Sequence, residues 1–174
     1  MKARGFLAGV ILSGVLCTPA MASLIGDTVT VTNNFDGSLY AGPTNVVVGG
    51  GVELTDFGGY WDIDIGSSAI RLFGFGLTGY FNGEDVYIFS DLDYLPTPSS
   101  IIGFAVTTIG TVTANVTVTS DSVTITHPDK SDISSDAEVL VTLRFEQNNI
   151  PEPGTLALLG LGLAGLAASR RRKQ

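Results

Sequence analysis

The stretch Glu-Val-Leu-Val-Thr-Leu-Arg-Phe-Glu at residues 138–146 decides the fold class of this chain. Apolar Val139, Val141, Leu143 and Phe145 take every second position, and mostly polar or charged side chains stand between them. Because successive side chains of a strand point to opposite faces, a period of two is typical of a strand with one buried face. The stretch therefore predicts a half-buried antiparallel β-strand.

The same period recurs along the chain in front of this stretch. Trp61, Ile63 and Ile65 alternate with Asp62 and Asp64, which places the apolar and the acidic side chains on opposite faces. Strands are predicted at residues 28–32, 44–48, 52–55, 61–65, 69–75, 85–90, 101–108, 111–119, 123–125 and 139–145.

Turn-forming residues separate these strands at short intervals. Glycine, asparagine and proline gather at residues 34–37, 49–51, 58–59, 82–83 and 96–98. No segment between them shows a helical period. Many short strands with such turns predict an all-β fold, an antiparallel β-sandwich, with a barrel as the less favoured alternative.

The N-terminus has the three parts of a cleavable signal peptide. Two cations in the first four residues precede a 12-residue apolar run, which is too short to span a bilayer. Ala20 and Ala22 then give the small-x-small pattern that signal peptidase needs, and Ser23 would become the new N-terminus. Residues 1–22 are therefore interpreted as a signal peptide that directs the chain to the Sec export machinery.

Cysteine content and charge limit what the exported part can do. Cys17 is the only cysteine and lies in the predicted signal, so the mature chain would have no thiol for a disulfide, a metal site or a nucleophile. Between Ser23 and Ile150, 16 acidic residues stand against three basic ones, a net charge of −13. Such a charge repels nucleic acid, and we expect no nucleic-acid partner.

The C-terminus ends in a second three-part segment. Pro151-Glu152-Pro153 is followed by 15 uncharged residues, 155–169, and then by a basic cluster. Leucine and alanine favour a helix, but at ~1.5 Å per residue it would reach roughly 22 Å, short of a ~30 Å hydrocarbon core. It could cross only with local thinning of the bilayer. The basic cluster that would stay in the cytoplasm consists of Arg170, Arg171, Arg172 and Lys173.

This order at the end of a chain resembles the PEP-CTERM sorting signal, with Pro151, Glu152 and Pro153 matching the motif. The resemblance covers about the last 25 residues and assigns residues 149–174 to a sorting signal with a transmembrane helix at 155–169. It implies that an exosortase, a multispanning membrane cysteine protease, recognises this segment and cuts near the motif. Until that cut, we expect the segment to hold the chain transiently in the inner membrane. It also implies release to the cell surface or the extracellular space. Members of the family occur in Gram-negative bacteria that make exopolysaccharide, often in biofilms. The alternative is an ordinary C-terminal anchor.

The exported domain, residues 23–148, offers few groups for catalysis. His127 is the only histidine, and its place before Pro128 predicts a solvated turn. Ser67 and Ser68 belong to a near miss of the nucleophile elbow. Two G-x-G-x-x-G matches, residues 74–79 and 160–165, lack the strand–turn–helix context of a dinucleotide site. We assign no catalytic, cofactor-binding or metal-binding residue and no cofactor.

Carboxylates and aromatic residues leave alternatives open. The pairs Asp62/Asp64 and Asp91/Asp93, with Glu84-Asp85, could bind Ca²⁺ or serve a glycosidase, but solvent-facing charge is the simpler interpretation. Several aromatic residues could form a sugar-binding platform or fill the core: Tyr60, Trp61, Tyr80, Phe81, Tyr87 and Tyr94. The sequence predicts a non-catalytic surface or matrix protein associated with exopolysaccharide. The alternatives are a carbohydrate-binding module and, less favoured, a secreted hydrolase that uses the paired carboxylates.

Overall fold

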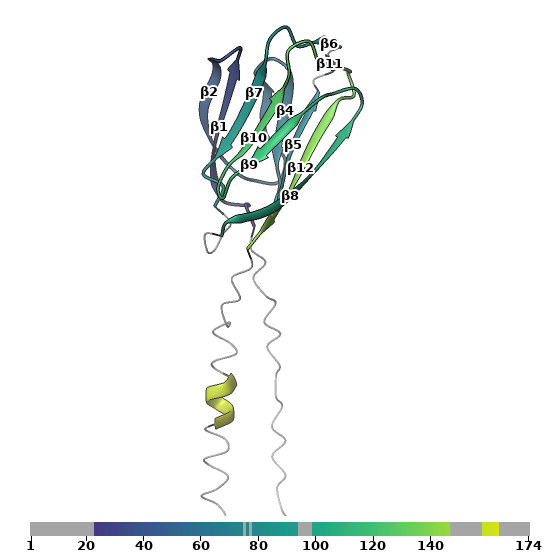
Figure 1. The fold of residues 1–174 in the computed structure, drawn as a ribbon. Helices are drawn as coiled ribbons and strands as arrows, with labels where there is room; N and C mark the ends of the chain where they lie inside the picture. The colour runs from purple at the N-terminus through teal and green to yellow at the C-terminus, as the bar shows by residue number, and fades with distance from the viewer. Residues whose placement is uncertain (1–22, 75, 77, 94–98, 147–157, 164–174) are drawn as a thin grey trace, which may run out of the picture. The chain divides into compact units, whose positions relative to one another are not determined.

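The computed structural model describes residues 23–74, 76, 78–93, 99–146 and 158–163. This part of the chain consists of β-strands in antiparallel sheets and one short helical segment at residues 158–163, so the prediction of an antiparallel β-rich fold is confirmed (Figure 1). The strands are β1 (Thr28–Phe35), β2 (Ser38–Val47), β3 (Val52–Phe57), β4 (Trp61–Ile65), β5 (Ala69–Gly74), β6 (Gly79–Tyr80), β7 (Asp85–Ser90), β8 (Ile101–Ile109), β9 (Asn115–Val118), β10 (Val123–His127), β11 (Asp132–Ile133) and β12 (Glu138–Phe145).

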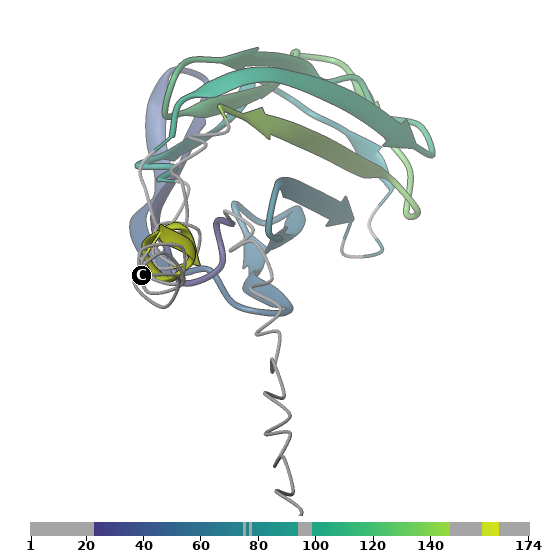
Figure 2. The ribbon, with the colours of Figure 1, turned by 90° about the horizontal axis from the view of Figure 1, so that it is seen from below.

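Ten of these strands form two five-stranded sheets. The first sheet has the order β2-β1-β7-β10-β9, and the second has the order β3-β4-β5-β12-β8. Every neighbouring pair is antiparallel. The short strands β6 and β11 pair with each other. Figures 1 and 2 show the two sheets as the layers of a sandwich, with β8 and β9 at the free edges on one side.

The core lies between the two sheets and follows the alternation of the sequence. In β4 the side chains of Trp61, Ile63 and Ile65 are buried, and the two aspartates between them are half-buried on the outer face. The register carries this alternation into β5 and β12, because Ile63 stands opposite Leu72, which in turn stands opposite Val139. Burial of these side chains is the main source of the free energy of folding.

The boundaries of the strands differ from the sequence prediction at the first hairpin. The predicted turn at residues 34–37 is only Asp36-Gly37, so β1 continues to Phe35 and β2 begins at Ser38 instead of Thr44. Asp36 and Gly37 both have positive φ angles, 49° and 76°. A two-residue turn of this kind matches the right-handed twist of the flanking strands, and asparagine, aspartate and glycine are the residues that tolerate it.

Two of the predicted segments lie mostly outside the described residues. The signal peptide, residues 1–22, is outside them. Of the predicted transmembrane helix at 155–169, residues 158–163 are described, and they are helical. Within the described part of the chain, no helix has the length and apolar character needed to cross a membrane.

Candidate functional site

One end of the sandwich core is polar, whereas the rest of the core is aliphatic and aromatic. Five buried side chains form what we call the polar end cluster: Asn33, Trp61, Asp85, Tyr87 and His127. They come from β1, β4, β7 and β10, and all of them are at most 1 % exposed. The register aligns Asn33 with Tyr87 and Asp85 with His127. Sheet pairing therefore brings together polar groups that are up to 94 positions apart in the chain, from 33 to 127.

His127 lies at the centre of this cluster. Its ring stacks on those of Trp61 and Phe81, with centroids 5.2 and 4.9 Å away and interplanar angles of 21° and 10°. His127 Nδ1 donates a hydrogen bond to the carbonyl oxygen of Thr113 at 2.9 Å, because a carbonyl can only accept. Burial lowers the pKa of His127 to about 4, although the bond to Thr113 opposes the shift. The imidazole is therefore neutral at pH 7.

The prediction of a solvated histidine at a turn is wrong for this residue. Val123, Ile125 and His127 occupy alternate positions of β10, and all three are buried on the inner face. The period of two therefore extends one step further than the apolar residues, and the histidine follows it into the core. The position of His127 in this alternation, two residues after Ile125 and four after Val123, is the signal in the sequence that could have predicted its burial.

Asp85 is a buried carboxyl group on the neighbouring strand. Its Oδ1 accepts a hydrogen bond from Asn33 Nδ2 at 2.5 Å. Burial raises the pKa of Asp85, and the hydrogen bond from Asn33 opposes the rise. Burial also raises the pKa of Tyr87, whose hydroxyl donates to the carbonyl oxygen of Phe57 at 3.4 Å. The sequence places Asp85 in an acidic pair at the start of a predicted strand. Its alternation with Tyr87 and Phe89, which are buried on the same face, is the signal that could have indicated its burial.

Several polar atoms of the cluster have no hydrogen-bond partner among the described residues. They are Asn33 Oδ1, Trp61 Nε1, Asp85 Oδ2 and His127 Nε2. Unsatisfied buried groups of this kind cost free energy, about 1–3 kcal/mol each. The side chains are closed to solvent, so the cluster offers no open surface to a substrate. We expect these buried polar groups to affect the stability of the domain and its dependence on pH.

The predicted acidic pairs lie in different parts of the sandwich. Asp62 and Asp64 are on the outer face of β4, as predicted, and Asp62 Oδ1 accepts from the backbone N–H of Asp56 at 2.9 Å. Asp91 and Asp93 follow β7 of the other sheet, where Asp91 Oδ2 accepts from Thr30 Oγ1 at 2.7 Å. The described residues include no group of three or more His, Cys, Asp or Glu side chains that could hold a metal ion.

The aromatic residues are divided between core and surface. Trp61, Phe81 and Tyr87 are fully buried, and Tyr60 is partly buried with its ring centroid 5.1 Å from that of Phe81. Tyr80 is exposed, and Tyr94 lies outside the described residues. The packing interpretation therefore holds for three of the six and does not hold for Tyr80.

Ser67 and Ser68 do not meet His127. They form the turn between β4 and β5, where their carbonyl oxygens accept from the backbone N–H groups of Leu24 and Leu143. Trp61, on which His127 stacks, begins β4, and the serines follow its last residue. The strand therefore separates the two groups that a nucleophile–base pair would need.

The two glycine patterns also take different forms. Gly74 is the last residue of β5, and Gly79 is the first residue of β6. In the second pattern residues 160–163 are helical, and residues 164–165 lie outside the described part. Neither described segment has a strand–turn–helix arrangement for a dinucleotide.

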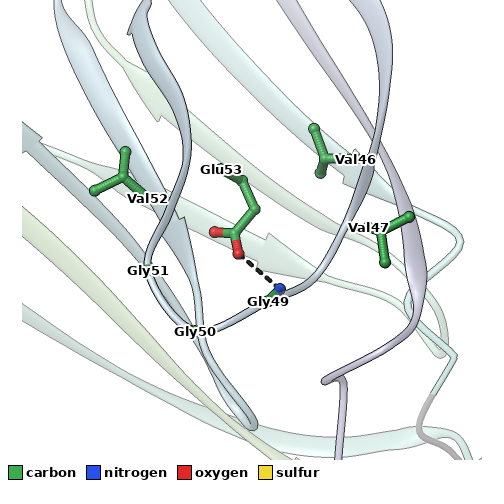
Figure 3. Close-up of a pocket in the computed structure, with 7 residues that line it drawn as sticks. All are labelled: Val46, Val47, Gly49, Gly50, Gly51, Val52 and Glu53. Atoms are coloured by element: carbon green, nitrogen blue, oxygen red, sulfur yellow. Dashed lines mark hydrogen bonds between the residues drawn. The ribbon is translucent and has the colours of Figure 1, made fainter.

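A shallow hollow of about 400 Å³ lies at the glycine turn between β2 and β3 (Figure 3). It is lined by Gly49, Gly50 and Gly51, by valines on either side and by Glu53. The Glu53 carboxylate accepts from the backbone N–H of Gly49 at 2.9 Å and from that of Ile65 at 2.6 Å. Both oxygens are thus used to fix the turn to β4, which is a structural role.

The predicted sorting residues lie almost entirely outside the described part of the chain. Ser23 is the first described residue, and its Oγ accepts from the backbone N–H of Ile25 at 3.0 Å. Those outside are Ala20, Ala22, Pro151, Glu152, Pro153, Arg170, Arg171, Arg172 and Lys173.

Comparison with known proteins gives one match, and it falls on this C-terminal segment. Residues 149–173 match the family model of the PEP-CTERM protein-sorting motif. Neither the curated proteins nor the solved structures gave a match to the chain. The chain therefore carries a PEP-CTERM sorting motif at its C-terminal end, the mark of an exported protein that an exosortase processes and sorts to the cell surface.

Proposed function

We propose that the β-sandwich is a non-catalytic component of the cell surface or of an extracellular polysaccharide matrix, delivered there by exosortase processing. The observation that carries this proposal is the match of residues 149–173 to the PEP-CTERM sorting motif. In this scheme the Sec machinery exports the chain, signal peptidase removes residues 1–22, and the C-terminal segment anchors the protein transiently in the inner membrane.

The composition of the C-terminal segment supports a transient anchor. Its 15 uncharged residues, 155–169, would give a helix of roughly 22 Å, which is short for a permanent span of a ~30 Å core. Pro151 and Pro153 favour an extended backbone, the form in which a protease binds its substrate. The basic residues 170–173 favour the cytoplasmic side, which would leave the motif at the outer face of the membrane.

The chemistry of the domain supports a non-catalytic role. The buried ionisable groups Asp85, Tyr87 and His127 face the interior of the sandwich. The carboxylate of Asp27, which is also buried, accepts hydrogen bonds from the backbone N–H groups of Thr28 and Asp93. The Glu53 carboxylate beside the glycine turn is bonded to backbone N–H groups. A domain with a net charge of −13 stays soluble and hydrated, which suits a protein that works within a hydrated matrix.

Cell fractionation tests the proposal. The full chain is followed in wild-type cells, in cells without the exosortase and in cells that make no exopolysaccharide. We expect the domain in the matrix fraction of wild-type cells, in the inner membrane without the exosortase, and in the medium without the polysaccharide. A matched variant, Pro151→Ala with Glu152→Ala and Pro153→Ala, should follow the pattern of the exosortase-deficient cells. The same distribution in all strains would contradict the proposal.

A further inference from the structure

The two main sheets end in four edge strands, and three of these carry features that discourage pairing with another chain. β2 contains Pro43 and has two register shifts against β1. β3 has two register shifts against β4 and carries Glu53 and Asp56. β9 has only four residues. Proline, charge, bulges and short length are the means by which proteins protect sheet edges from edge-to-edge association.

The fourth edge strand, β8, has only one of these features, a register shift against β12 at its N-terminal end. Its nine residues, Ile-Ile-Gly-Phe-Ala-Val-Thr-Thr-Ile at 101–109, include no proline and no charged side chain. It aligns with β12 without a register shift until its first residue, Ile101. Six of the nine residues are β-branched, which favours an extended strand. The backbone N–H of Ile101 donates to the carbonyl oxygen of Ser120 at 2.8 Å. The row of edge backbone groups that can accept another strand therefore lies along the rest of β8.

The side chains of β8 show that the core face of this strand is incompletely covered. Phe104 and Val106 stand opposite Leu143 and Val141 of β12, so all four share the inner face of the sheet. Leu143 and Val141 are 3 % and 0 % exposed, whereas Phe104 and Val106 are 44 % and 39 % exposed. The core thus continues to the edge of the sheet, where Val118 of β9 lines a hollow together with Phe104 and the last core members stay partly exposed.

The charge distribution sets this edge apart from the rest of the domain. Residues 94–120, which include β8 and β9, contain no charged side chain, although the domain has 16 acidic residues and three basic ones. The neighbouring strand β12 carries two charges. One is Glu138, whose carboxylate is 2.7 Å from the Arg71 guanidinium, and the other is the cation Arg144. Two acidic domains can therefore approach each other here with little repulsion.

We propose that β8 pairs antiparallel with β8 of a second copy of this chain. The β3-β4-β5-β12-β8 sheets of the two copies then form one continuous sheet. The pairing is self-complementary about a two-fold axis perpendicular to the sheet, the geometry of most homodimers. This axis keeps each face of the sheet on its own side, so Phe104 and Val106 meet the inner-face residues of the second copy. Two copies that each carry a net charge of −13 repel each other least where they meet at this uncharged edge.

Cysteine cross-linking of the full chain on the surface of its own host tests this pairing. A two-fold axis of this kind passes midway between the two copies of one residue of β8, so these two copies lie directly opposite each other. Opposed residues of antiparallel strands have Cα atoms about 4.5–5.5 Å apart, within the range of a disulfide. Ala105→Cys, Val106→Cys and Thr107→Cys are each oxidised on cells, and we expect a covalent dimer from at least one of them.

Two controls and one disrupting change make the experiment decisive. Val47→Cys, on the exposed face of edge strand β2, should stay monomeric, and so should the parent chain, whose mature form would have no cysteine. A lysine on β8 is then added to the cysteine variant that cross-links, as Thr107→Lys with Ala105→Cys or Val106→Cys, or as Ala105→Lys with Thr107→Cys. It should remove most of the dimer, whereas Thr117→Lys on β9 should leave it. Dimer yields no higher than for Val47→Cys would overturn the proposal. A cross-link from β8 to a different protein would also overturn it, because the occupant would not be a second copy.

Discussion

The rings of His127 and Phe81 stack at a centroid distance of 4.9 Å with their planes 10° apart, deep inside the sandwich. The contact joins the last residue of β10 to the segment between β6 and β7. Because the imidazole is stacked and closed to solvent, its protonation would place an uncompensated charge in the core. The polar end cluster therefore makes the stability of this domain sensitive to pH.

His127→Phe should flatten the acid side of the stability profile. The folded-state pKa of His127, about 4, lies below its ordinary value of 6.5, so the unfolded chain binds a proton first as the pH falls. The contribution of the neutral histidine is complete above pH 6.5 and is lost between pH 6.5 and 4, a change of about 3 kcal/mol. Denaturant unfolding of both proteins at pH 7 and pH 4 measures it. Equal pH dependence in the two proteins would show that His127 titrates normally.

Asp85→Asn should raise the free energy of unfolding at pH 7. Burial raises the pKa of Asp85, so the stability that its protonated form gives is complete below pH 3.8 and is lost as the pH rises through the raised pKa. Asparagine keeps an acceptor for Asn33 Nδ2 and removes the charge. The gain, measured by denaturant unfolding across this range, should shrink toward pH 3.

Asp85→Ala is the matched comparison for this residue. It removes the acceptor of the 2.5 Å bond from Asn33 Nδ2, so the free energy of unfolding should fall by about 1–3 kcal/mol. If the asparagine and alanine variants lose the same stability at pH 7, the carboxyl is not held in an unfavourable environment.

Gly58→Ala should destabilise the domain far more than Gly37→Ala. Both glycines have positive φ angles, 66° and 76°, so each alanine meets a similar backbone penalty of about 1 kcal/mol. A Cβ on Gly58 would also lie 2.5 Å from Tyr87 Oη and 2.8 Å from Asn33 Oδ1, whereas a Cβ on Gly37 meets nothing within 4 Å. Thermal unfolding of the two variants measures the difference, and equal melting temperatures would contradict the close packing of Gly58 on the polar end cluster.

The N-terminus of the exported protein should be Ser23. Ala20 and Ala22 occupy the small-residue positions that signal peptidase recognises after the apolar run. Edman sequencing of surface-located protein should begin Ser-Leu-Ile-Gly. Surface protein that begins at Met1 would rule out cleavage at this site.

Much of the fold can be predicted because it depends on a local pattern. The alternation in β4 and β12 and the apolar run of β7 identify these strands from the sequence alone, and the predicted strand at Asp85–Ser90 has the observed bounds. Which strands are neighbours cannot be predicted in this way. The pairing of β12 with β5 and β8 depends on contacts between distant segments, which leave no mark in the period of any one strand.

The buried polar residues show the same limit at the candidate site. The sequence favours surface positions for His127 and Asp85, because charged and titratable groups are usually exposed. Their burial follows from the register, which aligns Asp85 of β7 with His127 of β10. It also follows from the rings of Trp61 and Phe81, which stack on His127. The sorting motif, by contrast, is recognisable from the sequence because three adjacent segments of distinct composition define it.

The mass of the mature C-terminus tests the central claim most directly. Intact-mass and C-terminal peptide analysis of the surface protein would be compared between wild-type cells and cells that lack the exosortase. Exosortase processing predicts that roughly 20 residues are lost near Pro151-Glu152-Pro153 in wild-type cells and kept in the deficient cells. The same uncut C-terminus, ending at Gln174 in both strains, would contradict the claim and show that the segment is an ordinary anchor.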